Sequence, residues 1–191
     1  QYERNSTKFF NSKILWDFGN IKLESNTHWF DHRDELAFNK NIGGWDNYSN
    51  TEIGVNFNAI INYDWGTSKP GFTYNRETNS NTSVKEINRD HFSLSFQHDF
   101  SISKLKINLG TSGNYYDDFG WYTAPGMQLV YEINNNANIY HKYDHGFRLP
   151  SFYEMYADDY IYSGYSDLNG ESINAYEYGM QLYGSAMTIT F

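Results

Sequence analysis

Histidine is the residue type here that could most readily bind a metal ion, and four of the six histidines form two pairs with equal spacing. His28 is followed by His32, and His141 is followed by His145. On a β-strand, residues four apart share a face but lie roughly 13 Å apart, because each residue advances the strand by about 3.3 Å. Neither pair could therefore bind a single ion. The sequence also has no cysteine, so no metal site is expected.

Nucleophilic catalysis has suitable residue types but no supporting motif. Serine, histidine and aspartate are all frequent, and His91 and Ser93 would share one face of a strand. No serine lies in the Gly-x-Ser-x-Gly turn that exposes a hydrolase nucleophile. The glycine-containing segments 43–44 and 110–113 lack the Lys-Ser/Thr ending of a phosphate-binding loop. The sequence therefore does not indicate an enzyme, and no catalytic residue is assigned.

Two adjacent aspartate pairs are candidates for calcium binding. Asp117–Asp118 and Asp158–Asp159 offer the carboxylate oxygens that Ca²⁺ prefers. Solvated charge at the tips of loops is the simpler interpretation of both pairs.

Aromatic residues in predicted loops are the main candidates for ligand contact. Such residues often bind ligands, because a rigid ring offers a large contact area. In a membrane barrel the same rings could instead form the aromatic girdle at the interface. The candidates for ligand contact are Trp45, Tyr48, Tyr74, Tyr153, Tyr156, Tyr160 and Tyr162.

Alternating segments must position these candidates. In the clearest segment, Ile53, Val55 and Phe57 alternate with small or polar residues, which predicts a strand with one apolar face. Alternation predicts about nine strands in all, over residues 9–16, 21–34, 51–63, 85–99, 104–116, 127–133, 137–144, 176–183 and 186–191. Long loops are predicted over residues 33–50, 64–84 and 148–172, and the remaining connections are short.

Composition favours a membrane barrel. Aromatic residues make up 19% of the 191 residues, with 18 Tyr, 14 Phe and 5 Trp, yet the mean hydropathy is −0.73. An apolar outer band, aromatic girdles and a polar interior produce this mixture. No run of about 18 apolar residues predicts a transmembrane helix. The net charge of −9 argues against a nucleic-acid partner.

Two motifs near the end of the sequence follow one another in the order, and at the spacing, of a known family. The first motif is Gly-Phe-Arg-x-Pro-Ser followed by Glu-x-Tyr, and its matching residues are Gly146, Phe147, Arg148, Pro150, Ser151, Glu154 and Tyr156. The second motif is Asn-Pro-x-Leu-x-x-Glu followed by Tyr-Glu-x-Gly, and its matching residues are Leu168, Glu171, Tyr176, Glu177 and Gly179. Tyr165-Ser166 stands where the family usually has Asn-Pro. From about residue 90 onward, the sequence resembles the C-terminal half of a TonB-dependent outer-membrane receptor.

The resemblance implies an all-β fold: an antiparallel up-and-down transmembrane β-barrel with long outer loops. Residues 1–191 would be a partial barrel with about nine of roughly 22 strands, one piece of a single barrel domain whose plug and other strands lie elsewhere. Arg148 and Glu154 would form a structural clamp at the outer end. No signal peptide begins at Gln1, so a mature form or a fragment is expected.

The resemblance also implies a function. Such receptors carry out TonB-dependent uptake of scarce nutrients, most often iron–siderophore complexes, across the outer membrane of Gram-negative bacteria. The implied partners are outer-membrane lipid, the TonB complex acting through the plug, and a small iron chelate. No cofactor of the protein itself is implied, although the ligand can carry iron. Haem stays open as a ligand, because Tyr can ligate haem iron and the predicted loop after Pro150 is rich in Tyr.

Two other classes of protein fit the same sequence. One is a complete small outer-membrane barrel that acts as an adhesin or a channel. The other is a soluble glycan-binding β-sandwich. The first predicts a signal peptide directly before Gln1 and a stop codon directly after Phe191. The second predicts a monomer that is soluble without detergent.

Overall fold

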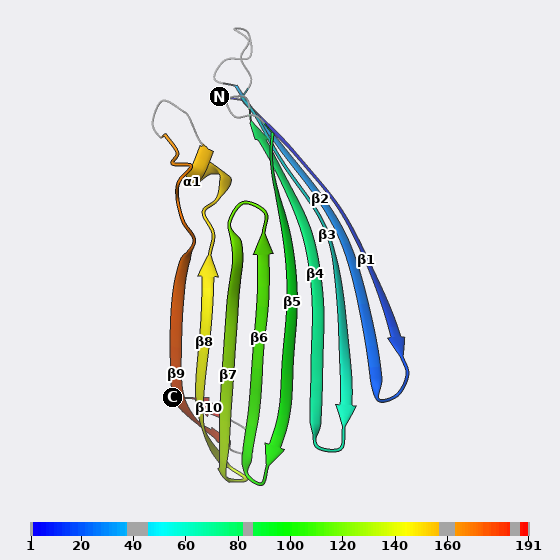
Figure 1. Ribbon diagram of the computed structural model, residues 1–191, viewed down its shortest axis with the longest axis vertical. Coiled ribbons are helices and arrows are strands. Elements are labelled where there is room, and N and C mark those ends of the chain that lie inside the picture. Colours follow the sequence, from blue (N-terminus) through cyan, green and yellow to red (C-terminus); the bar gives the residue numbers. More distant parts are fainter. Residues whose placement is uncertain (1, 38–45, 82–85, 157–162, 184–187, 191) are drawn as a thin grey trace.

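The chain folds into a single antiparallel sheet with one short helix at an end (Figure 1). The computed structural model describes residues 2–37, 46–81, 86–156, 163–183 and 188–190. The ten strands follow chain order across the sheet: β1 (Tyr2–Asp17), β2 (Ile21–Ala37), β3 (Asp46–Tyr63), β4 (Gly66–Asn81), β5 (Ile87–Ile102), β6 (Leu105–Tyr116), β7 (Gly120–Asn134), β8 (Ala137–Arg148), β9 (Glu171–Tyr183) and β10 (Thr188–Thr190). Helix α1 (Phe152–Tyr156) lies between β8 and β9. The predicted all-β, up-and-down architecture is confirmed.

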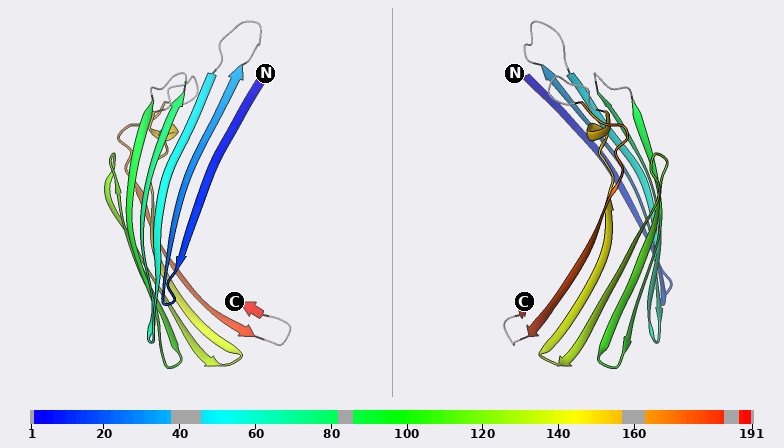
Figure 2. Two further views of the ribbon diagram at one scale, coloured as in Figure 1. Left: turned by 90° about the vertical axis from the view of Figure 1, so that its right-hand side faces the viewer. Right: turned by 60° about the vertical axis from the view of Figure 1, so that its left-hand side comes forward.

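The sheet is strongly curved, and its two ends differ (Figure 2). At the lower end in Figure 1, tight turns join β1 to β2, β3 to β4, β5 to β6 and β7 to β8. We call this the turn end. At the β1–β2 turn, Asp17 Oδ1 accepts a hydrogen bond from the Gly19 amide, and Gly19 has a φ of 79° that few other residues adopt. The opposite end, which carries α1, is the loop end.

One face of the sheet is apolar. Neighbouring strands align Phe57 with Phe72, and Phe72 with Leu94, so that apolar side chains form continuous rows. Leu94 is 63% exposed and Phe57 is 50% exposed. The buried apolar residues among those described are Phe152 and Met155 of α1 and Pro150 just before it. The apolar face of the sheet is therefore not covered by protein.

An uncovered apolar face rules out the β-sandwich. A sandwich buries the apolar faces of two sheets against one another, whereas all the described strands belong to one sheet. Lipid is the environment in which such a face is stable, because apolar side chains there need not be removed from water. No helix in the described ranges is both long and apolar enough to cross a bilayer.

The other face of the sheet is polar and concave. Asn56 of β3, Thr73 of β4, Ser93 of β5 and Asn114 of β6 are cross-strand neighbours on it. Side chains from β3, β4, β5, β6 and the end of β8 line one hollow on this face, which requires the sheet to curve around it. A polar concave wall and an apolar convex wall are the two sides of a membrane barrel.

The sheet does not close. Within the described ranges, β1 pairs with β2 alone and β10 pairs with β9 alone, so both stand at its edges. A complete barrel would join its first strand to its last. The described strands are therefore part of a barrel wall, as the partial-barrel interpretation predicted, and not the closed small barrel.

The predicted loop over residues 64–84 is wrong. Strand β4 occupies Gly66–Asn81, which brings the described strands to ten. Its upper part pairs fully with its neighbours, with Glu77 opposite Glu52 and Asn79 opposite Asn50. The strand continues here above the apolar band, where both faces meet water and alternation no longer marks a strand. The loop predicted over residues 33–50 is shorter for the same reason, since β2 extends to Ala37 and β3 begins at Asp46.

A charge introduced on β5 should have a different effect on stability on each of the two faces. Leu94→Arg places a cation on the apolar face and should destabilise the protein in lipid vesicles by about 2–4 kcal/mol. Ser95→Arg, on the adjacent concave position, should change stability by less than about 1 kcal/mol. Urea unfolding in vesicles measures both. Equal losses from the two variants would mean that the faces are assigned wrongly.

Candidate functional site

Arg148 and Glu154 meet in a two-pronged ion pair at the loop end. Arg148 Nη1 donates to Glu154 Oε2 at 2.9 Å, and Nη2 donates to Oε1 at 2.8 Å. Arg148 Nε also lies 3.6 Å from the carboxylate of Glu171, the first residue of β9. The guanidinium group thus connects the last residue of β8 to α1 and to the start of β9. A paired, planar geometry of this kind is specific for Arg and carboxylate.

Ser151 and Glu154 form a capping box that starts α1. The Ser151 hydroxyl accepts a hydrogen bond from the Glu154 amide at 3.2 Å, and Glu154 Oε2 accepts one from the Ser151 amide at 2.8 Å. Each side chain thereby satisfies an amide that the short helix leaves free. These bonds, together with the charge of Arg148, lower the pKa of Glu154 below its ordinary value. The Arg-x-Pro-Ser-x-x-Glu part of the sequence motif is therefore a local folding unit.

Arg89 of β5 anchors this unit to the sheet. It is 8% exposed. Its Nε donates to Asp118 Oδ2 at 2.7 Å, and its Nη2 donates to the carbonyl oxygen of Pro150 at 3.1 Å. Its guanidinium carbon lies 5.1 Å from the ring centroid of Phe119 and 4.6 Å from that of Phe152. One side chain thus joins β5, the turn between β6 and β7, and the segment that leads into α1.

Arg89 was not predicted as a site residue. The aspartate pair 117–118 was considered for calcium binding, but the structure uses both carboxylates internally. Asp118 pairs with Arg89, and Asp117 Oδ1 accepts a hydrogen bond from the amide of Asp90 at 2.9 Å. Asp158 and Asp159 lie outside the described residues. Arg89 and Asp118 are 29 residues apart in the sequence, so their pairing could be predicted only from the strand register.

A hollow of about 290 Å³ lies beside Arg89 on the concave face. The residues that line it are Glu52, Asn75, Glu77, Arg89, His91, Tyr116, Phe147 and Leu149. The His91 and Tyr116 rings stack with their centroids 4.3 Å apart, and the ring of Phe147 meets that of Tyr116 edge-on at 6.0 Å. Polar acceptors and aromatic rings therefore converge on one space, which is typical of a small-molecule site.

Four of the predicted ligand residues are among those that the structure describes, and two of them share α1. Tyr153 lies in α1 and is exposed, and Tyr156 ends α1. Tyr48 of β3 is at the loop end, where its hydroxyl accepts a hydrogen bond from Asn79 at 2.7 Å. Trp45, Tyr160 and Tyr162 lie outside the described residues.

Tyr74 lies on the apolar face of the sheet. It was predicted in a loop, but it lies within β4 on the apolar face, where its ring centroid is 4.8 Å from that of Phe92. Its hydroxyl donates to Asp90 at 2.9 Å.

Glu177, another residue of the sequence motif, lies well below the loop end in β9. Its carboxylate accepts a hydrogen bond from Tyr140 at 2.7 Å.

No metal-binding cluster of three or more His, Cys, Asp or Glu side chains occurs within the described ranges. His28 lies 3.1 Å from Glu52, and His32 lies 3.0 Å from Asp34. His141 stacks on Tyr178 with centroids 4.5 Å apart. Each of these three histidines therefore has a carboxylate or an aromatic partner in the sheet.

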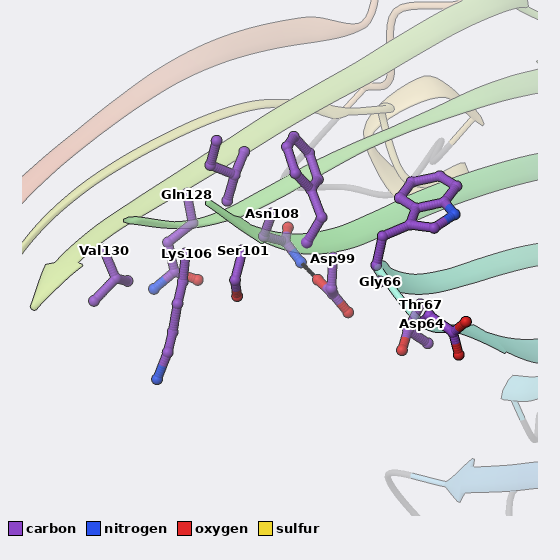
Figure 3. Close-up of a pocket in the computed structure, with 12 residues that line it drawn as sticks. Asp64, Gly66, Thr67, Asp99, Ser101, Lys106, Asn108, Gln128 and Val130 are labelled. Atoms are coloured by element: carbon purple, nitrogen blue, oxygen red, sulfur yellow. Dashed lines mark hydrogen bonds between the residues drawn. The ribbon is translucent and has the colours of Figure 1, made fainter. Parts of the chain in front are cut away.

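A second hollow, of about 580 Å³, lies at the turn end (Figure 3). Asp99 is its most connected residue: it accepts hydrogen bonds from Asn108 and Gln97 and forms an ion pair with Lys69 at 2.6 Å. Lys106, which also lines this hollow, pairs with Glu132 at 2.6 Å. This region holds none of the motif residues, so the candidate ligand site is the hollow at the loop end.

Comparison with known proteins identifies the family. The sequence matches the TonB-dependent receptor-like β-barrel family over residues 1–191. This chain belongs to that family. It is a family of receptors and not of enzymes. No curated protein sequence matches the chain.

Solved structures of TonB-dependent receptors share its fold. The ferric enterobactin receptor PfeA of Pseudomonas aeruginosa, in a mutant form, superimposes with a TM-score of 0.84 at 10% identity, over 97% of this chain and 33% of that one. The siderophore receptor PirA of Acinetobacter baumannii gives 0.81 at 9% identity, over 98% and 34%. The FrpB iron transporter of Neisseria meningitidis gives 0.76 at 11% identity, over 97% and 36%. This chain thus spans about a third of the length of these proteins.

Acid should loosen α1 through Glu154. Because its pKa in the folded protein lies below the ordinary 4.5, the carboxylate stabilises α1 fully above pH 4.5, and this stabilisation is lost as the pH falls through the folded pKa. Hydrogen-exchange protection of the α1 amides, corrected for intrinsic rates, should therefore fall below pH 4.5. In Glu154→Gln, protection should be lower at neutral pH and constant over this range. An acid response retained by the variant would assign the effect to another group.

Arg89→Lys should release α1 from the sheet. The variant keeps the charge but loses the second hydrogen bond and the flat surface between the two phenylalanine rings. Chymotrypsin cleavage after Tyr153 and Tyr156 should accelerate by about tenfold or more, because a hydrogen bond to a charged group stabilises by about 1.5–3 kcal/mol.

Arg76→Lys is the matched control for this experiment. Arg76 makes a looser pair with Asp90 at 3.9 Å and is half exposed, so its replacement should leave the cleavage rate unchanged. If the two variants were cleaved equally fast, Arg89 would not be the anchor.

Proposed function

We propose that this chain is part of the barrel wall of a TonB-dependent receptor in the outer membrane of a Gram-negative bacterium, and that the intact receptor takes up an iron–siderophore complex. The observation that carries the proposal is the family match over residues 1–191. The siderophore receptors PfeA and PirA share its fold, and this supports iron–siderophore uptake over other nutrients. Residues 1–191 would then belong to one barrel domain, whose plug and other strands lie outside them.

Aromatic belts on the apolar face support a membrane location. Near the loop end, Tyr74, Phe92, Tyr115 and Trp121 are successive cross-strand neighbours. One step further toward the loop end, Arg76 of β4 pairs in register with Asp90 of β5, so charge begins where the aromatic belt ends. Toward the turn end, the ring centroids of Tyr63 and Trp65 lie 5.3 Å apart. Two such belts bracket the apolar band of outer-membrane barrels.

The separation of the belts fits the thickness of the bilayer. Phe92 lies in the belt near the loop end, and Phe100 pairs in register with Gly66, beside Trp65 near the turn end. The two are eight residues apart, which is about 26 Å along a strand and about 20 Å of height on a strand tilted by about 40°. This is close to the apolar band of an outer-membrane barrel, which is about 25 Å tall. The strands of this chain are therefore long enough to cross the membrane and to continue beyond it at the loop end.

The concave face would contact the plug and the ligand at different heights. The hydrogen-bonding groups around Asp99 at the turn end (Figure 3) would contact the plug, through which the TonB complex acts. The hollow beside Arg89 at the loop end opens on the side from which a ligand arrives. Arg148, Ser151 and Glu154 hold the loop segment beside that hollow. The proposed function is binding and translocation, without covalent chemistry.

Deletion of the gene that encodes this chain tests the proposal. The deletion strain should lose uptake of radioactive iron supplied as its ferric siderophore and should match a strain that lacks TonB. Growth in chelator-treated medium should fall with it, and the intact gene should restore both. Growth on haem as the iron source is measured for comparison. If the deletion strain lost growth on haem alone, the ligand would be haem and not a siderophore. Unchanged uptake from every iron source would overturn the proposal.

A further inference from the structure

The described cations of the concave wall near the loop end are all committed to carboxylates. Arg89 pairs with Asp118 at 2.7 Å, and Arg148 pairs with Glu154 at 2.8 Å. An anionic ligand would need to break one of these pairs to gain a cation from this part of the wall. The hollow is therefore unsuited to an anion.

Glu77 and Glu52 give the same hollow the opposite character. The two residues are direct cross-strand partners on the concave face, and both line the hollow. Like charges placed opposite one another destabilise a sheet. Glu52 has His28 as a partner at 3.1 Å, whereas Glu77 makes no hydrogen bond or ion pair with any of the residues that the structure describes. A cation placed between the two carboxylates would remove the repulsion.

Other groups of the hollow also suit a cation. The side-chain oxygen of Asn75 is buried and has no hydrogen-bond donor among the described residues. Tyr116 and Phe147 present aromatic rings to the same space. Aromatic rings attract organic cations through their electron-rich faces. Acceptor oxygens and rings together, with no metal-binding cluster among the described residues, favour an organic ammonium group over a metal ion.

We propose that the hollow binds a ligand-borne ammonium group at Glu77, so that this receptor selects a ferric chelate that is neutral at the iron centre and carries a pendant amine. This inference rests on the proposed function. A ferric trihydroxamate has this character, because three singly charged hydroxamates balance iron(III). A ferric tris-catecholate such as ferric enterobactin is trianionic and would be repelled by Glu52 and Glu77, because the basic residues beside them, His28 and Arg89, already have carboxylate partners. Similarity of fold to PfeA, at 10% identity, thus coexists with a different preference for ligand charge.

Binding to the intact, purified receptor tests this inference with three probes: a ferric trihydroxamate with a pendant ammonium group, the same chelate after N-acetylation, and ferric enterobactin. The amine-bearing chelate should bind about tenfold or more tightly than its acetylated form, as expected for one charge-assisted hydrogen bond. Ferric enterobactin should bind most weakly of the three.

Glu77→Gln should abolish the preference for the amine over its acetylated form. Glu86→Gln is the matched control, because it removes the same charge from an exposed residue that does not line the hollow. The comparison of probes on the unaltered receptor needs no variant, so a failure of Glu77→Gln to assemble would leave the test intact.

The outcomes separate the two proposals. Equal binding of the amine and its acetylated form, or tightest binding of ferric enterobactin, would overturn the ammonium site while leaving siderophore uptake in place. Absence of binding to all three chelates, together with normal iron uptake in the deletion strain, would remove the proposed function and the inference with it.

Discussion

A backbone amide in lipid has no water to bind, so each strand in a bilayer must take its hydrogen bonds from its neighbours. Register in this protein follows from that constraint. From β5 to β6, every residue from His91 to Ile102 has a partner, and the alternation of side chains then assigns one face to lipid and the other to the barrel interior. Pro70, which has no amide hydrogen, sits where the β3–β4 ladder lacks partners between Gly71 and Ser68. Pro70 is the one residue of β3 and β4 that cannot donate a backbone hydrogen bond, and the interruption lies at this residue.

The loop end obeys a different rule, because it lies beyond the bilayer. The buried apolar side chains in the described part of the chain are those of Pro150, Phe152 and Met155, and they lie where Arg89 is buried. Water makes burial favourable there, and the buried guanidinium is stable because its partners are a carboxylate, a carbonyl oxygen and two aromatic rings. The protein thus combines a lipid-solvated wall with a small water-soluble core at its rim.

Local patterns were enough to predict most of the fold. Strict alternation identified β3 and β5, because it depends on residues close in sequence. Strand β4 was missed, since its upper half is polar on both faces. Residues of the hollow were missed for a related reason: Glu77, Asn75 and Arg89 come together only through register between strands. Tyr74 was misplaced because its neighbours Asn75 and Arg76 resemble a loop when read along the chain.

The continuation of β2, β3, β4 and β5 above the aromatic belt affects how a ligand is captured. From Tyr74 to the end of β4 at Asn81 there are seven residues, which is about 23 Å of strand. A ligand approaching from outside would first meet hydrogen-bonded sheet. A rim already fixed in shape loses little conformational entropy when it closes on a guest. In the proposed receptor, such a rim would hold a dilute nutrient tightly without a folding step.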